Sequence, residues 1–336
     1  MKISNLMACA LAGACLVVGG AVADEMGISH DFELPRDVVS AATAFENYMN
    51  NAASIGRFSG SSEVAQSVRT GAGYEPAQLE EGMIGYGAIA ALQDDRFVYG
   101  VDRAAGRGED RRAFAERLIE DPFEATQIDG AASAARRVEA ALASRAAPLM
   151  SAAKDVKAAA YSVQHQAWSK VMVDDAQGRL AEIKRLSNVR LDPSESDNQK
   201  MMVNVAIADS RMAADDAPAG FSAIEAKALA LAAESVLGHA HGEDRARLAP
   251  LLTETSSAQC LRMSKLNLYQ CMAVAGPEYE DIFCLGQHAM MDTSECVDHA
   301  AHAVAPTRVA TASSAAARGA YAVPLVAHHS LRIDPN

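Results

Sequence analysis

Four of the six cysteines lie close together near the C-terminal end, at positions 260, 271, 284 and 296. The sequence around them has helical punctuation: Ser256–Gln259 has the Ser-x-x-Gln form of a helix start, and Gly276-Pro277 is a strong stop. A second helix is expected from about Glu278, with another start signal at Asp292–Glu295. The segment is therefore predicted to be a helical hairpin with a break before Cys296.

Helix geometry decides which of these cysteines can pair. Cys260 and Cys271 would stand about 16 Å apart along one helix, whereas a disulfide tolerates at most about 7 Å between Cα atoms. That pairing is excluded, and the pairing of Cys284 with Cys296 is excluded with it. Because Cys271 and Cys284 flank the turn of an antiparallel hairpin, we predict nested disulfides, Cys271–Cys284 inside and Cys260–Cys296 outside.

The hairpin is similar to the twin-cysteine helical hairpins, in which each helix carries a Cys-x9-Cys pair. Here the two spacings are Cys-x10-Cys and Cys-x11-Cys. The resemblance is confined to this segment and concerns its architecture, so it implies no activity.

A metal site is the alternative interpretation of the same segment. Histidines follow two of the cysteines at i, i+4 and i, i+3 spacings, which direct ligands to one side of a helix. The four candidate zinc ligands, to which His302 adds a fifth, are Cys284, His288, Cys296 and His299. This alternative leaves Cys260 and Cys271 without a role, whereas nested disulfides use all four cysteines.

The N-terminal residues 1–23 have the pattern of a secretory signal peptide. An apolar run from Leu6 to Val18 precedes the small-residue pattern Ala21-Val22-Ala23. The run is short for a retained membrane anchor, which needs roughly 20 apolar residues. Lipid attachment at Cys9 or Cys15 is a further alternative. Cleavage after Ala23 predicts a periplasmic or secreted protein without a transmembrane segment, in a compartment that favours disulfides.

The charge balance argues against nucleic acid as a partner. The whole chain has a formal net charge of -13, and loss of Lys2 with the signal peptide makes the mature chain one unit more negative. Nucleic-acid binding requires clustered Lys and Arg that release counterions from phosphates, and the sequence has no basic stripe.

The remaining sequence predicts an all-α protein, an irregular multi-helix bundle that ends in the disulfide-linked hairpin. Aromatic residues make up only 5% of the chain, and apolar residues recur with helical rather than strand periodicity. We expect an N-terminal helical domain over 24–212, a linker over 213–220, a C-terminal helical domain over 221–303 and a poorly ordered tail over 304–336. Ser222–Glu225 has the form of a capping box that begins a helix.

Three glycines lie in the helical segment that follows Pro76. Gly82, Gly85 and Gly87 are not placed between a strand and a helix, as the glycines of a nucleotide-binding loop would be. They predict close packing between helices.

A seam of apolar residues runs through the segment 131–171. Its members recur at intervals of four and three, the spacing of helices that pack side by side: Leu142, Ala146, Leu149, Ala153, Val156, Ala160, Val163 and Ala167. Pro148 lies inside this segment and predicts a kink or break near Arg145. The partner helix could belong to this chain or to an unknown protein partner, so the oligomeric state stays open.

Two short motifs are typical of a class of serine enzymes. Ser151 and Lys154 form a Ser-x-x-Lys motif, and Ser196–Asn198 reads Ser-Asp-Asn, so together they resemble two of the three signatures of the penicillin-recognising serine enzymes. The third, Lys-Thr-Gly, is absent downstream, and Arg69-Thr70-Gly71 comes before the serine. We therefore predict no catalytic residue and no cofactor.

These observations favour an exported, soluble, non-enzymatic helical protein that acts as an interaction or structural component of the cell envelope. A metal-binding or thiol-handling module built on Cys284, His288, Cys296 and His299 ranks second. A serine acyl enzyme using Ser151 and Lys154 ranks third.

Overall fold

A computed structural model describes residues 33–209, 220–240 and 245–302. Within these ranges the chain is helical, and its only β-type pairing is an isolated bridge between Met172 and Pro277. The all-α fold class with a disulfide-linked C-terminal hairpin is therefore confirmed. The predicted signal peptide and tail, and all of the predicted linker except Gly220, lie outside the described residues.

Most of the helices of the described residues lie before residue 210. They are α1 (Arg36–Ala53), α2 (Ser61–Ala72), α3 (Pro76–Ala91), α4 (Asp95–Ala105), α5 (Glu109–Glu120), η1 (Pro122–Gln127), α6 (Ala131–Val163), η2 (Trp168–Lys170), α7 (Ala176–Leu186) and α8 (Glu195–Asp209). The C-terminal part contains α9 (Ala223–Val236), α10 (Arg245–Leu248), η4 (Ala249–Leu251), α11 (Thr255–Val274), α12 (Glu278–Cys284), η5 (Leu285–Met291) and α13 (Asp292–His302).

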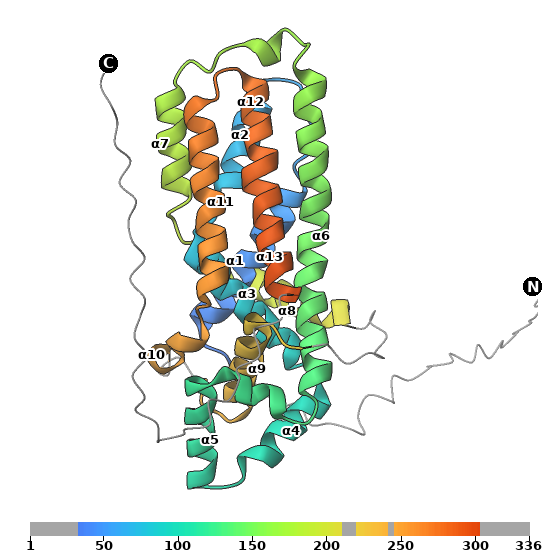
Figure 1. Cartoon of the computed structure of the whole chain (residues 1–336), viewed down its shortest axis with the longest axis vertical. Helices are drawn as coiled ribbons and strands as arrows, with labels where there is room; N and C mark the ends of the chain where they lie inside the picture. Colours follow the sequence, from blue (N-terminus) through green and yellow to red (C-terminus); the bar gives the residue numbers. More distant parts are fainter. Residues whose placement is uncertain (1–32, 210–219, 241–244, 303–336) are drawn as a thin grey trace, which may run out of the picture.

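The long helix α6 runs along most of the length of an elongated bundle (Figure 1). The hairpin of α11 and α12–α13 lies alongside its C-terminal part, with α7 on the outer side of α11 (Figure 1). In the rest of the bundle, α3 packs against α1, α6 and α9. Helices of the two predicted domains thus contact each other directly, as α3 does with α9 and α6 with α13, and the division into domains stays a prediction.

Close helix packing occurs where α3 carries its glycines. A Cβ atom at Gly82 would collide with the backbone of Ala41 on α1, and one at Gly87 would lie 2.9 Å from Val138 Cγ1 on α6. Only glycine allows helices to approach this closely.

Helix α6 continues from Ala131 to Val163 through Pro148, so the predicted break does not occur, while a kink near Arg145 stays a prediction. Leu149 and Ala146, on either side of the proline, are buried. Packing on both sides therefore offsets the backbone hydrogen bond that Pro148 removes, a loss of about 3 kcal/mol.

The apolar seam is buried within this one chain. Every predicted member from Leu142 to Val163 is buried, and α12, η5 and α13 pack on α6 along this face. Ala167 lies beyond the end of the helix and is exposed. The suggestion that the seam receives a separate protein partner is therefore corrected: its surface is already covered by the hairpin.

Two of the predicted helix starts differ from the structure. Helix α11 begins one residue before Ser256, because Glu254 accepts hydrogen bonds from the backbone N–H groups of Ser256 and Ser257. No helix starts anew at Asp292, since α12, η5 and α13 follow one another without a gap. The capping box at Ser222 and Glu225 is present as predicted.

None of the described helices has the length and apolar character needed to cross a membrane.

Candidate functional site

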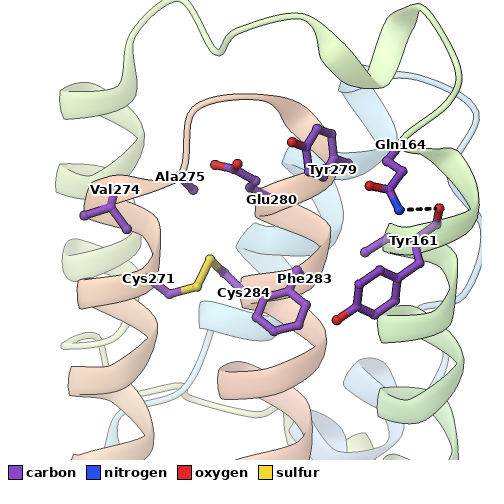
Figure 2. A pocket seen from close by; sticks show the side chains of 10 residues that line it. Tyr161, Gln164, Cys271, Val274, Ala275, Tyr279, Glu280, Phe283 and Cys284 are labelled. Atoms are coloured by element: carbon purple, nitrogen blue, oxygen red, sulfur yellow. Dashed lines mark hydrogen bonds between the residues drawn. A yellow bond between two sulfur atoms is a disulfide. The ribbon is translucent and has the colours of Figure 1, made fainter.

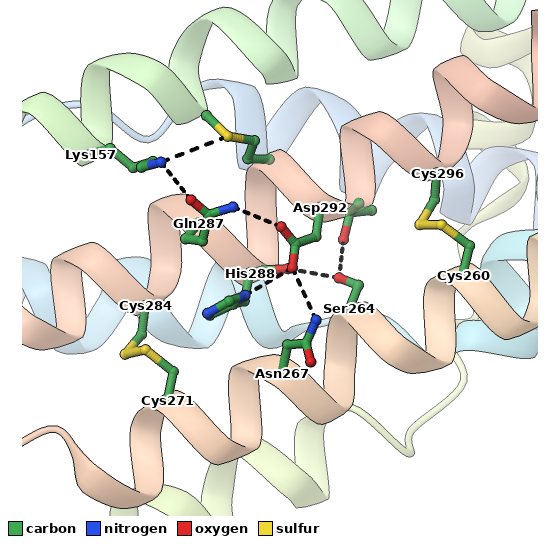
Figure 3. A network of polar contacts seen from close by, with 12 residues as sticks. Lys157, Cys260, Ser264, Asn267, Cys271, Cys284, Gln287, His288, Asp292 and Cys296 are labelled. Carbon is green, nitrogen blue, oxygen red and sulfur yellow. Dashed lines mark hydrogen bonds and ion pairs between the residues drawn. A yellow bond between two sulfur atoms is a disulfide. The ribbon is translucent and has the colours of Figure 1, made fainter.

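Two disulfides hold the hairpin together. Cys271 pairs with Cys284 next to the turn, with Cα atoms 5.6 Å apart, and Cys260 pairs with Cys296 farther along, at 5.7 Å. This is the nested arrangement that antiparallel geometry requires. The hairpin is therefore closed covalently at two levels (Figure 3).

The disulfides remove two sulfur ligands from the metal alternative. Cys284 and Cys296 are bonded to other cysteines, and a thiolate is the form that binds zinc. His288 donates to Asp292, while His302 lies 3.3 Å from Glu139. Among the described residues, no group of three or more His, Cys, Asp or Glu side chains is arranged to hold a metal ion.

A π-helical segment, η5, joins α12 to α13. The wider turn of a π-helix disturbs the i to i+4 bonding of its carbonyl groups, and side chains can supply donors. Ser264 Oγ donates to His288 O at 2.7 Å, and Tyr48 Oη donates to Ala289 O at 2.7 Å. Gly286 lets the segment approach α6, since a Cβ there would lie 3.0 Å from the backbone nitrogen of Lys157.

Asp292 is the centre of a polar network on the hairpin between the two disulfides (Figure 3). Its carboxylate accepts hydrogen bonds from His288 Nδ1 at 2.8 Å, Gln287 Nε2 at 2.9 Å and Asn267 Nδ2 at 3.4 Å. Lys157 Nζ extends the network by donating to Gln287 Oε1 at 2.5 Å. Burial acts to raise the pKa of Asp292, but the hydrogen bonds from His288 and Gln287 outweigh it, so this pKa lies below its ordinary value.

A second polar cluster, on the same hairpin, is buried. Tyr74 Oη is hydrogen-bonded to Thr293 Oγ1 at 2.8 Å and to Ser264 Oγ at 3.2 Å. Lys265 Nζ donates a hydrogen bond to Ala72 O at 2.7 Å. Burial raises the pKa of Tyr74 to about 12 and lowers the pKa of Lys265 well below its ordinary value. Because these four side chains are at most 3% exposed, we interpret the cluster as structural.

An open pocket lies beside the inner disulfide (Figure 2). Its volume is about 380 Å³, and residues of α6, α11 and α12 form its walls. The lining residues are Ala160, Tyr161, Gln164, Cys271, Val274, Ala275, Tyr279, Glu280, Phe283 and Cys284. It is therefore an aromatic and aliphatic pocket that contains one carboxylate.

Two of the polar side chains in this pocket are held in place. Glu280 Oε2 accepts a hydrogen bond from Gly276 N–H at 2.8 Å, and Gln164 Nε2 donates to Tyr161 O at 3.0 Å. Sequence reasoning did not single out this pocket. The i, i+4 spacing of Tyr279 and Phe283 in a chain with few aromatic residues was a signal that could have found it.

The residues of the serine-enzyme pattern lie on two different helices, α6 and α8. Ser151 and Lys154 are exposed on α6, and Ser196–Asn198 lies at the start of α8. Asp197 accepts from Ser194 and Lys200, while Asn198 Oδ1 accepts from Thr43 on α1.

No protein-family model matches this chain, and no curated protein and no solved structure matches it. The hairpin and its pocket are therefore the features from which a function can be inferred.

Proposed function

We propose that the protein is an exported, soluble helical protein of the periplasm or cell surface that acts by binding a partner rather than by catalysis. The two disulfides support an oxidising compartment. The signal-peptide pattern of residues 1–23 supports export.

The observation that carries the proposal is an exposed apolar surface at the turn of the hairpin. We call this surface the hairpin tip and define it by Tyr161, Val171, Met172 and Val274, whose exposed fractions are 59%, 52%, 62% and 83%. Apolar surface that is rimmed by polar groups and left open to water is characteristic of interaction sites.

Backbone contacts place the segments that carry these side chains next to one another. Met172 forms the isolated β-bridge with Pro277, and the carbonyl oxygen of Val171 accepts a hydrogen bond from the backbone N–H of Glu278 at 3.1 Å. The loop before α7 therefore lies against the turn of the hairpin. Tyr161 and Val274 both line the pocket beside the inner disulfide. Because these contacts hold the backbone in place, binding here loses little backbone conformational entropy.

Arg179 on α7 strengthens the attachment of the tip. Its guanidinium donates to Met272 O at 2.7 Å and to Ala275 O at 3.0 Å, at the end of α11, and to Asp281 Oδ1 at 2.6 Å on α12. One side chain therefore fixes both helices of the hairpin to α7.

Site-specific photo-crosslinking in the native envelope tests this proposal. A crosslinking amino acid at position 172 or 274 should give one defined adduct, and the same amino acid at exposed Arg112 on α5 should not. The substitution Val274→Glu should abolish the adduct formed from position 172. Equal labelling from all three positions, or none from the tip, would contradict the proposal.

A thiol-handling role remains a second candidate because Cys271 and Cys284 form part of the pocket wall. A bound thiolate that attacked this disulfide would form a mixed disulfide with one cysteine and release the other as a thiolate. Intact mass after incubation with a small thiol and alkylation distinguishes the two roles: an unmodified mass excludes exchange, and a mixed disulfide at Cys271 or Cys284 supports it.

A further inference from the structure

The pocket between α6, α11 and α12 has a wall of three aromatic rings. Tyr161 comes from α6, and Tyr279 and Phe283 lie one helical turn apart on α12. The rings of Tyr161 and Phe283 are 6.2 Å apart between centroids and inclined at 73°. Figure 2 shows these two rings close together, with Tyr279 and Gln164 nearer the turn of the hairpin.

From this wall and the carboxylate of Glu280, we infer that the pocket binds a small organic cation with a quaternary ammonium group. The methyl groups of the cation contact the aromatic rings, and its charge faces Glu280. The inference rests on the proposed binding role of this surface and names the chemistry of its ligand.

The electrostatics of the pocket select for a cation. Its lining includes Glu280 and no Lys or Arg, and the whole chain has a formal net charge of -13. Aromatic ring faces carry negative potential, so they attract a cation placed over them, most strongly where water is excluded. Lys157 Nζ lies 5.7 Å from the centroid of the Phe283 ring but is not a lining residue, so Tyr161, Tyr279 and Glu280 provide most of the attraction.

The apolar part of the wall favours a quaternary over a primary ammonium group. A primary ammonium has three donors to satisfy, and Glu280 Oε2 is already bonded to Gly276 N–H. A quaternary ammonium donates no hydrogen bond, so it can lie against apolar side chains without leaving a donor unpaired. Methyl groups also suit the aliphatic part of the wall, which Ala160, Val274 and Ala275 form.

The size of the pocket limits the ligand to a small molecule. Its volume of about 380 Å³ lies near the lower end of the roughly 300–1,000 Å³ usual for ligand sites. A trimethylammonium head with a short chain fits this volume. The disulfide in the wall keeps α11 and α12 at a fixed separation, so the pocket exists before the ligand binds.

Titration of the oxidised mature protein with choline, followed by NMR, tests the inference. The control ligand is 3,3-dimethylbutan-1-ol, which has the shape of choline with carbon in place of the charged nitrogen. We expect choline to bind at least about ten times more tightly, as a cation–π contribution of 1.4 kcal/mol or more implies. Equal affinity for the two ligands, or no binding of choline, would overturn the inference.

Three variants connect the binding to the pocket. Tyr161→Leu and Phe283→Leu keep an apolar side chain but remove a ring, and Glu280→Gln keeps an acceptor for Gly276 while removing the charge. Each should weaken choline binding several-fold with little change in the control ligand. Tyr99→Leu, which alters an exposed tyrosine on α4, should leave binding unchanged. Circular dichroism confirms that each variant is folded, and wild-type affinity in all three folded pocket variants would refute the site.

The two proposals can fail separately. Crosslinking from positions 172 and 274 without choline binding would remove the ligand inference and leave the binding role of the tip. Choline binding without any tip-specific crosslink would remove the partner-binding role of the tip and leave the ligand inference.

Discussion

Removal of each disulfide should destabilise the protein by an amount that follows from the nesting of the two bridges. The inner bridge closes a sequence separation of 13 residues, and the outer one closes 36. With the inner bridge in place, the outer one closes the 23 residues that remain when 13 is subtracted from 36. The loop-entropy relation then gives about 3.4 kcal/mol for the outer bridge when the inner one is present, and about 2.9 kcal/mol for the inner bridge alone.

A thermodynamic cycle gives the remaining value. Together the two bridges contribute about 6.3 kcal/mol, and the outer bridge alone would contribute about 3.8 kcal/mol. Loss of the inner bridge from the intact protein should therefore cost about 2.5 kcal/mol, which is about 1 kcal/mol less than loss of the outer bridge. The inner pair costs less because the outer bridge already restrains the unfolded chain around it.

Urea unfolding at 25 °C, followed by circular dichroism, measures these differences. The variants are Cys271→Ala with Cys284→Ala, and Cys260→Ala with Cys296→Ala, because alanine avoids placing an unpaired hydroxyl at the buried cysteines Cys284 and Cys296. The variant without any of the four cysteines should be less stable than either. A larger loss for the inner pair than for the outer pair would refute the reasoning, as would losses below about 1 kcal/mol for both pairs.

Three further predictions concern packing, pH and the serine-enzyme pattern. Gly82→Ala should lower the free energy of unfolding by at least about 2 kcal/mol in urea, because its Cβ collides with the backbone of Ala41, whereas a wild-type value would contradict the packing. Burial raises the pKa of Glu80, Glu225 and Asp281 to about 7, above their unfolded values. The stability that their protonation supplies should therefore be lost as pH rises from about 4 to 7. Urea midpoints should therefore be lower at pH 8 than at pH 5, and a midpoint that rises would contradict these shifts. A fluorescent penicillin should not label Ser151 at any concentration, as intact mass would show.

The hairpin could be predicted because its constraints are local and covalent. Helix rise and disulfide reach depend on spacing alone, so the positions of Cys260 and Cys271 were enough to exclude one connectivity. The π-helical segment could not be predicted in this way. Its carbonyl groups at His288 and Ala289 are bonded by Ser264 and Tyr48, which come from other helices. A distant side chain that stabilises a local backbone form leaves no periodic signal in the segment itself.

The helix starts show how similar patterns lead to different outcomes. Ser222 and Glu225 form the expected capping box, with both reciprocal hydrogen bonds. At Ser256 the same pattern fails because Glu254 caps the helix two residues earlier. The sequence at Asp292 matches a helix N-cap, but the residue lies inside a continuous helix. Its carboxylate accepts hydrogen bonds from His288 and Asn267 of the hairpin instead. Sequence patterns identified the polar residues, and tertiary contacts decided which groups they bind.

The inner disulfide and the exposed tip are connected by one physical argument. Two helix ends normally stay together by burying apolar side chains between them. Here Cys271 and Cys284 join the end of α11 to α12 covalently, and Arg179 adds three hydrogen bonds to the same junction. Val274, in the last turn of α11, is therefore not needed to hold the helices together and remains 83% exposed. A covalently closed turn thus allows an apolar side chain to face water without loss of the fold, which is the condition a preformed binding surface has to meet.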